Sequence, residues 1–140
     1  MNIEVNYIAV LLAGVASMAL GFFWYSESFL GKPWMKEKGF TQESIKKAQK
    51  EMGMWYGLSF VVSLITAFVM SNVMTLSENF YHYPMHQTGL TSAFWMWVGF
   101  VMPVQVTATI FGNKNWKLLG IDTGYQFVSL LAMGVVLSLL

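Results

Sequence analysis

Four apolar segments, separated by short polar ones, restrict this chain more than any other feature of its sequence. Each segment runs about 19 to 23 residues. A helix of about 20 residues crosses a hydrocarbon core of about 30 Å. The sequence therefore predicts an all-α membrane protein with four transmembrane helices. The predicted spans are residues 7–25, 55–76, 92–111 and 118–140.

The composition supports this class of protein. Apolar residues make up 56% of the 140 residues and charged residues only 11%, so a soluble globule could not hide four such segments from water. The length fits a single transmembrane domain, residues 1–140. The chain has no arginine and no dense basic run, which argues against nucleic-acid binding. It also has no cysteine, which excludes disulfides and thiol chemistry.

The lysines predict how the chain threads the membrane. All eight basic residues are lysines, and they lie in the first and third gaps between the spans. The N-terminal segment, the middle gap and the C-terminus have none. Because cytoplasmic loops are enriched in lysine and arginine, we expect both lysine-bearing gaps to be cytoplasmic and both termini to lie outside.

Small residues recur every four positions in the first two spans, which places them along one side of each helix. Such stripes let two helix backbones approach closely in lipid. We therefore expect the first two spans to pack as a tight antiparallel hairpin. The helix-packing residues are Ala9, Ala13, Ser17 and Gly21 in the first span and Ser59, Ser63, Ala67 and Ser71 in the second.

The first lysine-bearing gap predicts a short amphipathic helix on the cytoplasmic side. Thr41 is a fair N-cap, and Glu43 falls in the first turn, where the helix dipole favours an acid. Ile45, Ala48 and Met52 then recur at helical spacing. We expect this helix to lead into the second span, either in the headgroup layer or as a solvated extension of that span.

Polar residues interrupt the third and fourth spans. Pro103 predicts a kink in the third span. Gln105, Gln126, Asp122 and Tyr125 form a candidate intramembrane polar site, which either lines a cavity or only bonds neighbouring helices. For Asp122, the simpler interpretation is a capping acid near a helix N-terminus.

Two segments that follow the first and third spans pair lysine with tryptophan. Lys32, Trp34, Lys114 and Trp116 are candidate contacts for an anionic lipid headgroup. The alternative is ordinary anchoring at the membrane interface. The similarity of the two segments also suggests a parallel 2+2 repeat of helical hairpins.

Motifs for catalysis, cofactor binding or metal binding do not stand out. The sequence has no nucleophile elbow and no phosphate-binding glycine loop. His82 and His86 have a spacing that would suit a metal on a helix, but Pro84 between them argues against a regular helix. We therefore expect no catalytic residue, no cofactor and no metal site.

Several motifs carry a resemblance to a known family. They are Trp24-Tyr25-Ser26, Phe29-Leu30-Gly31-Lys32-Pro33-Trp34, Phe111-Gly112, Trp116-Lys117-Leu118 and Gly124-Tyr125-Gln126-Phe127-Val128-Ser129-Leu130. In these the chain resembles the small bacterial integral membrane proteins of domain-of-unknown-function family 1761. That family usually has proline after the first motif, where this chain has Glu27. The resemblance implies a four-span protein of the bacterial cytoplasmic membrane and implies no activity.

Three kinds of function remain open at this point. The first is non-enzymatic association with itself, with lipid or with a membrane complex. The second is a small transporter or channel, which requires a homo-oligomer because one four-helix bundle is narrow. The third is a lipid-modifying enzyme that uses Glu27 or Asp122 with Lys32. Membrane lipid is the expected partner, and nucleic acid is not expected as one.

Overall fold

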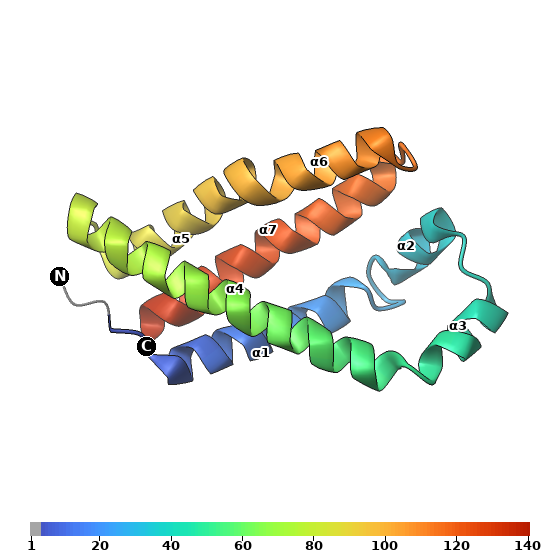
Figure 1. Cartoon of the computed structure of the whole chain (residues 1–140), viewed down its shortest axis with the longest axis horizontal. Coiled ribbons are helices and arrows are strands. Elements are labelled where there is room, and N and C mark those ends of the chain that lie inside the picture. The colour runs from blue at the N-terminus through green and yellow to red at the C-terminus, as the bar shows by residue number, and fades with distance from the viewer. Residues whose placement is uncertain (1–3) are drawn as a thin grey trace.

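The computed structural model describes residues 4–140, and every regular element in that range is helical. Four helical rods are long and apolar enough to cross a membrane. They are α1 (Tyr7–Trp24), α4 (Met52–Tyr81), the composite of α5 (Met85–Met96), η1 (Trp97–Val101) and α6 (Met102–Phe111), and α7 (Trp116–Leu139). Two short helices, α2 (Gly31–Lys38) and α3 (Gln42–Gln49), join α1 to α4 (Figure 1). The predicted all-α class with four candidate transmembrane helices is confirmed.

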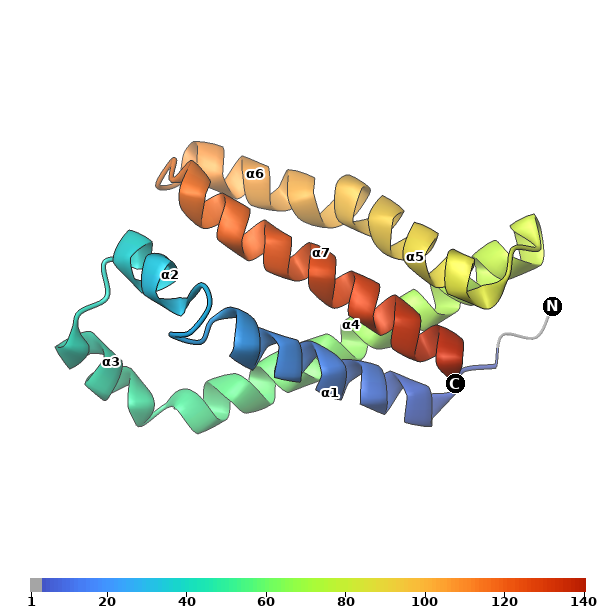
Figure 2. The same cartoon turned by 180° about the vertical axis from the view of Figure 1, so that it is seen from behind.

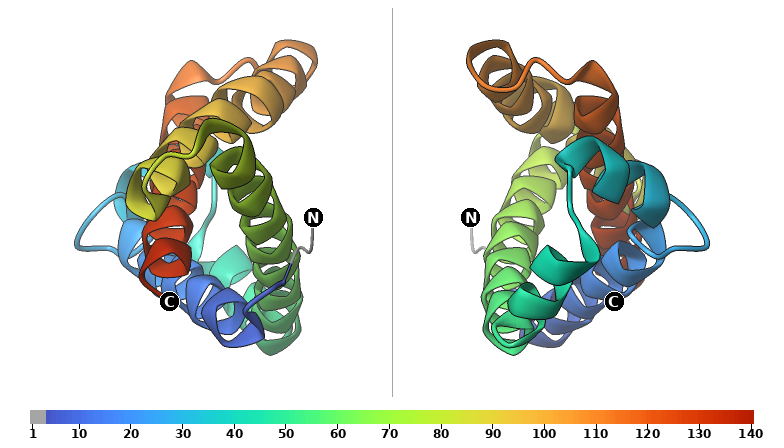
Figure 3. Two further views of the ribbon diagram at one scale, coloured as in Figure 1. Left: turned by 90° about the vertical axis from the view of Figure 1, so that its left-hand side faces the viewer. Right: turned by 90° about the vertical axis from the view of Figure 1, so that its right-hand side faces the viewer.

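The four rods form a bundle in which α7 and α4 occupy opposite corners (Figure 3). The rod α7 packs along α1 on one side and along α5 on the other. The rod α4 closes the ring, because it packs on α1 and α5 and only lightly on α7. The helix α6 packs against α7 and, among the described residues, makes no substantial contact with α4. The bundle is therefore closed where α5 lies and more open where α6 lies.

The two ends of the bundle differ in charge. One end carries residues 25–51 and the loop at 112–115, and all eight lysines lie in these segments or in the first turn of α7, so we call it the lysine end (Figure 2). The other end holds the α4–α5 connection, the start of α1 and the end of α7, and we call it the terminal end (Figure 1). There the Asn6 side chain donates a hydrogen bond to the Leu140 carbonyl oxygen at 3.2 Å. This arrangement is compatible with the predicted threading, whose direction across the membrane stays a prediction.

The half of the bundle nearer the terminal end holds the buried apolar core, beside an open groove of about 890 Å³ between α4 and α5 that Ser77, Thr88 and Thr91 help to line. In this half, Gly89 of α5 crosses Gly134 of α7 so closely that a Cβ on Gly134 would lie 2.6 Å from the Gly89 carbonyl oxygen. Only glycine at both positions allows this approach of two backbones. The buried apolar cluster that surrounds the crossing comprises Ala9, Val10, Ala13, Ala67, Met70, Met74, Ala93, Leu130, Met133 and Leu137.

The third rod changes its helical geometry next to Pro103. Pro103 is the second residue of α6 and has no N–H to donate to the preceding turn, and the π-helical turn η1 lies just before it. The distortion lies where the sequence predicts a kink. Within η1, the Trp97 indole donates a hydrogen bond to the Thr123 carbonyl oxygen of α7 at 2.9 Å. The distorted turn is thereby attached to α7.

The connection between α1 and α4 contains two helices, of which the sequence predicted one. The predicted amphipathic helix corresponds to α3, whose N-cap is Thr41 and whose capping box pairs Thr41 with Ser44. The helix α2 was missed. It is held to the start of α7 by a hydrogen bond from Asn115 Nδ2 to Glu37 at 2.8 Å and by Lys117, 3.6 Å from the same carboxylate.

Candidate functional site

The lysine-end half of the bundle is held together by side-chain hydrogen bonds. At the end of α1, the Trp24 indole donates to the Ile121 carbonyl oxygen of α7 at 3.0 Å. The next residue, Tyr25, donates its hydroxyl to Asp122 Oδ1 at 2.7 Å. Gly31 lies against the turn that follows α1, since a Cβ there would clash with the Tyr25 carbonyl oxygen. Trp24 and Tyr25 therefore hold the end of α1 against α7, and Gly31 allows the chain to turn closely after it.

A buried hydroxyl bridge joins α1 and α7 deeper in the bundle. The Ser17 and Ser129 hydroxyl oxygens are 2.6 Å apart, and both residues are buried. The Tyr125 hydroxyl donates to the Ser17 carbonyl oxygen at 3.1 Å and lies 3.4 Å from the Ser17 hydroxyl. Buried polar groups in lipid need such partners because no water competes for them. This bridge therefore both binds the helices and places hydroxyl groups at mid-bundle.

Next to this bridge lies a cavity of about 350 Å³ between α1, α4 and α7, which we call the hydroxyl-lined cavity. It occupies the part of the bundle where α4 and α7 diverge. None of its lining side chains is charged. The lining residues are Ser17, Met18, Trp55, Leu58, Ser59, Val62, Ser63, Thr66, Tyr125, Gln126, Ser129, Leu130 and Met133.

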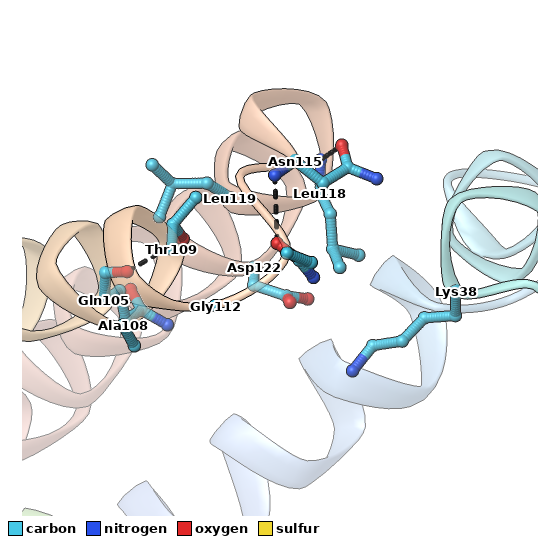
Figure 4. A pocket seen from close by; sticks show the side chains of 10 residues that line it. Lys38, Gln105, Ala108, Thr109, Gly112, Asn115, Leu118, Leu119 and Asp122 are labelled. Carbon is cyan, nitrogen blue, oxygen red and sulfur yellow. Dashed lines mark hydrogen bonds between the residues drawn. The ribbon is translucent and has the colours of Figure 1, made fainter.

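A second cavity, of about 270 Å³, lies at the lysine end between α2, α6 and α7, and we call it the lysine-end cavity. In contrast to the first, its lining includes an acid, Asp122, and a base, Lys38. Figure 4 shows the Asp122 carboxylate between the side chains of Gln105 and Lys38. The oxygen Oε1 of Gln105 is buried and, among the described residues, has no hydrogen-bond partner.

The structure divides the four predicted polar residues between these cavities. Gln105 and Asp122 line the lysine-end cavity, whereas Gln126 and Tyr125 line the hydroxyl-lined one. They therefore line two cavities and not one. The residues of the alternative enzyme site, Glu27 and Lys32, are both exposed on the surface. Within residues 4–140, no three His, Asp or Glu side chains gather closely enough to hold a metal ion.

The small residues of α1 pack against two helices, α7 and α4, and not against α4 alone. Ala9, Ala13 and Ser17 are buried, and Ser17 bonds α7. A Cβ on Gly21 would lie 3.0 Å from the Tyr125 hydroxyl, so this glycine also lies against α7. Gly14 is one of the α1 residues that lie against α4, since a Cβ there would lie 2.8 Å from Leu64.

The small residues of α4 lie in different surroundings along that helix. Ala67 belongs to the buried core, and Ser59 and Ser63 line the hydroxyl-lined cavity. Ser71 is half-buried and lines none of the cavities described above. Sequence reasoning missed Gly14, Gly89 and Gly134, because single glycines outside a repeat give no local signal.

The four candidate headgroup contacts all lie at the lysine end. Lys32, Lys114 and Trp116 are exposed. Trp34 is half-buried, and its ring packs edge-on against Tyr25 at 5.2 Å between centroids. The Lys38 ammonium lies 5.6 Å from the centroid of the Trp34 ring. Trp34 therefore contacts both Tyr25 and Lys38.

The comparison with known proteins identifies a family of unknown function. No curated protein and no solved structure is significantly similar to the chain. Residues 8–138 match the family described as "protein of unknown function (DUF1761)". The match covers nearly the whole chain, from the start of α1 to the end of α7. The chain therefore belongs to the DUF1761 family.

Proposed function

We propose that this protein is a multi-pass protein of the bacterial cytoplasmic membrane that acts by association with lipid, and that the hydroxyl-lined cavity holds an uncharged polar group of an amphiphile. The lining of that cavity is the observation that carries the proposal. In this proposal the protein binds lipid and does not transform it. The lysine end lies in the cytoplasm, as the positive-inside rule predicts.

The chemistry of the lining selects the kind of ligand. The hydroxyl groups of Ser59 and Ser63 and the amide of Gln126 can donate and accept hydrogen bonds. The Thr66 hydroxyl donates to the Val62 carbonyl oxygen and can still accept one. No lining side chain offers a counter-charge, and an unpaired ion in a low-dielectric site is strongly disfavoured. The preferred guest is therefore an alcohol, ester or amide carried on an apolar chain.

The size and position of the cavity also support an amphiphile. A volume of about 350 Å³ falls within the range of small-molecule sites, which runs from about 300 to 1,000 Å³. Because α4 and α7 touch only lightly, a lipid can enter sideways between them. Trp55 and Leu58 on α4 supply apolar surface for the chain that follows the polar group.

The position of the hydroxyl groups favours binding over transport by one chain. The lining reaches Ser63 and Thr66 on α4, and the next buried residues toward the terminal end are Ala67, Met70 and Met74. A path to the outside needs polar groups beyond Thr66. Ser71, the next hydroxyl-bearing residue along α4, does not line this cavity. We therefore place transport behind association.

Photolabelling tests the proposal directly. The protein is reconstituted in nanodiscs with a photoreactive diacylglycerol, whose head is an uncharged hydroxyl group beside two esters. We expect cross-links on the segment of α4 that contains Trp55, Ser59 and Ser63. Ser63→Leu fills the cavity and should reduce this labelling at least fivefold.

A matched control uses the same substitution two turns further along the same helix. Ser71→Leu places the added bulk outside the cavity and should leave the labelling unchanged. Ser59→Leu, at an exposed lining position, repeats the test if Ser63→Leu lowers the yield of folded protein. Equal labelling of the parent and both cavity variants, or equal labelling of α4 by a photoreactive phosphatidic acid, would refute the proposal.

A further inference from the structure

The lysine-end cavity is a separate site whose lining calls for a ligand of its own. It combines a carboxylate, a carboxamide and an ammonium group drawn from three helices. The hydroxyl-lined cavity has no charged lining residue, so the two cavities suit different chemistry. The following proposal does not depend on the first one.

The acidic side of the cavity offers acceptors for hydrogen bonds. Tyr25 occupies Oδ1 of Asp122, and Oδ2 of Asp122 has no hydrogen-bond partner among the described residues. The buried Oε1 of Gln105 also lacks a donor. The C-terminal end of α6 borders the same cavity at Ala108 and Thr109, and a helix C-terminus carries partial negative charge. This side therefore favours a cationic group with N–H bonds to donate.

The opposite side of the cavity offers a positive charge. Lys38 reaches it from α2, and within residues 4–140 no carboxylate lies within 4.0 Å of its ammonium group. Figure 4 shows this side chain extending toward the space beside Asp122. The pair of Asp122 and Lys38 makes the lining electrically neutral overall. A neutral but polarised site complements a zwitterion better than a simple cation or anion.

We propose that the lysine-end cavity binds a zwitterionic ligand in which a primary ammonium group and a phosphate lie a few atoms apart. The ammonium group donates hydrogen bonds to Asp122 Oδ2 and to the amide oxygen of Gln105. The phosphate lies against Lys38. A cavity of about 270 Å³ has room for such a headgroup, since one water takes about 30 Å³ of liquid.

Two sources carry this chemistry, a phosphatidylethanolamine headgroup and free phosphoethanolamine. The hydrogen-bond requirement separates both from choline, because a quaternary ammonium group has the same charge but no N–H to donate. The predicted order of retention is therefore phosphatidylethanolamine, then its N,N-dimethyl derivative, then phosphatidylcholine. Phosphatidylglycerol should be retained least, since it lacks the ammonium group and faces Asp122.

Native mass spectrometry of the protein released from nanodiscs with equal amounts of these lipids measures the order. We expect phosphatidylethanolamine to be retained about tenfold more than phosphatidylcholine, as for the loss of a charge-assisted hydrogen bond. Added phosphoethanolamine tells the sources apart: displacement of the lipid at low millimolar concentration assigns the site to the free compound, and no displacement assigns it to the lipid.

Three substitutions tie the preference to the site. Asp122→Asn keeps an oxygen for Tyr25 and removes the charge, and it should abolish the preference over phosphatidylcholine. Gln105→Leu should do the same, whereas Gln87→Leu on the exposed surface of α5 is the matched control and should change nothing. Lys38→Gln should lower the retention of both lipids. Equal retention of the two lipids by the parent protein, or a preference that survives both Asp122→Asn and Gln105→Leu, overturns the proposal.

Discussion

The close crossing of Gly89 and Gly134 predicts how much stability the protein loses when one methyl group is added at Gly134. A Cβ on Gly134 would lie 2.6 Å from the Gly89 carbonyl oxygen and 2.9 Å from its carbonyl carbon. An ordinary contact begins near 3.4 Å, so α5 and α7 must separate by about 0.8 Å. Backbone atoms cannot rotate away as a flexible side chain can. Gly134→Ala should therefore carry an overpacking cost of about 1–3 kcal/mol.

Replacing glycine by alanine also raises helix propensity, which offsets part of the steric cost. A second glycine of α7, which has no close neighbour, serves as a control for this gain. At Gly120 of α7 a Cβ would meet nothing within 4 Å, so Gly120→Ala should stabilise by up to about 1 kcal/mol. Both variants gain the same propensity, and their difference isolates the steric cost of about 1–3 kcal/mol. Equilibrium unfolding in mixed micelles of mild detergent and dodecyl sulfate measures both. Equal free energies of unfolding for the two variants would contradict the close crossing.

Three further predictions concern threading, the hydroxyl bridge and α2. A single cysteine at Asn79 should react with an impermeant maleimide in intact cells, and one at Gln49 should not; labelling at Gln49 alone would reverse the orientation. Ser17→Ala removes the bridge to α7 and should lower the free energy of unfolding by about 0.6–1 kcal/mol, measured in the same micelles. The hydrogen bond from Asn115, followed by the charge of Lys117, holds the pKa of Glu37 below its ordinary value of 4.5. The attachment of α2 should therefore be intact above pH 4.5 and weaken as the pH falls below it; spin-label distances between α2 and α7 that stay constant down to pH 3 would argue against it.

Hydropathy was sufficient to predict the number and type of the long helices. Apolar length is a local property of the chain, and in lipid a backbone of that length must satisfy its own hydrogen bonds, which a helix does. The N-cap at Thr41 was predictable for the same reason, since capping depends on residues within one turn. Pro103 likewise marked the distorted turn because its missing N–H acts locally.

Features that depend on tertiary contacts were not predictable in this way. Gly31 and Pro33 make residues 31–38 look like a loop, yet α2 forms there and its Glu37 is bound by Asn115 across 78 residues. The division of Gln105 and Gln126 between two cavities follows from how α6 splays from α4, which no local pattern encodes. A glycine such as Gly134 carries no sign of the partner backbone that it admits.

The contrast between the two halves of the bundle explains how a small membrane protein can keep a polar interior. In lipid, apolar burial does not drive helices together, so close packing must do so. The terminal half supplies that packing through Gly89, Gly134 and the methionine-rich core around Met70. The lysine-end half is then free to diverge, with Ser17 and Ser129 holding α1 to α7 while α4 leans away. Because the buried core around Met70 lies between the hydroxyl-lined cavity and the terminal end, a ligand of that cavity enters and leaves sideways between α4 and α7 and not through the core.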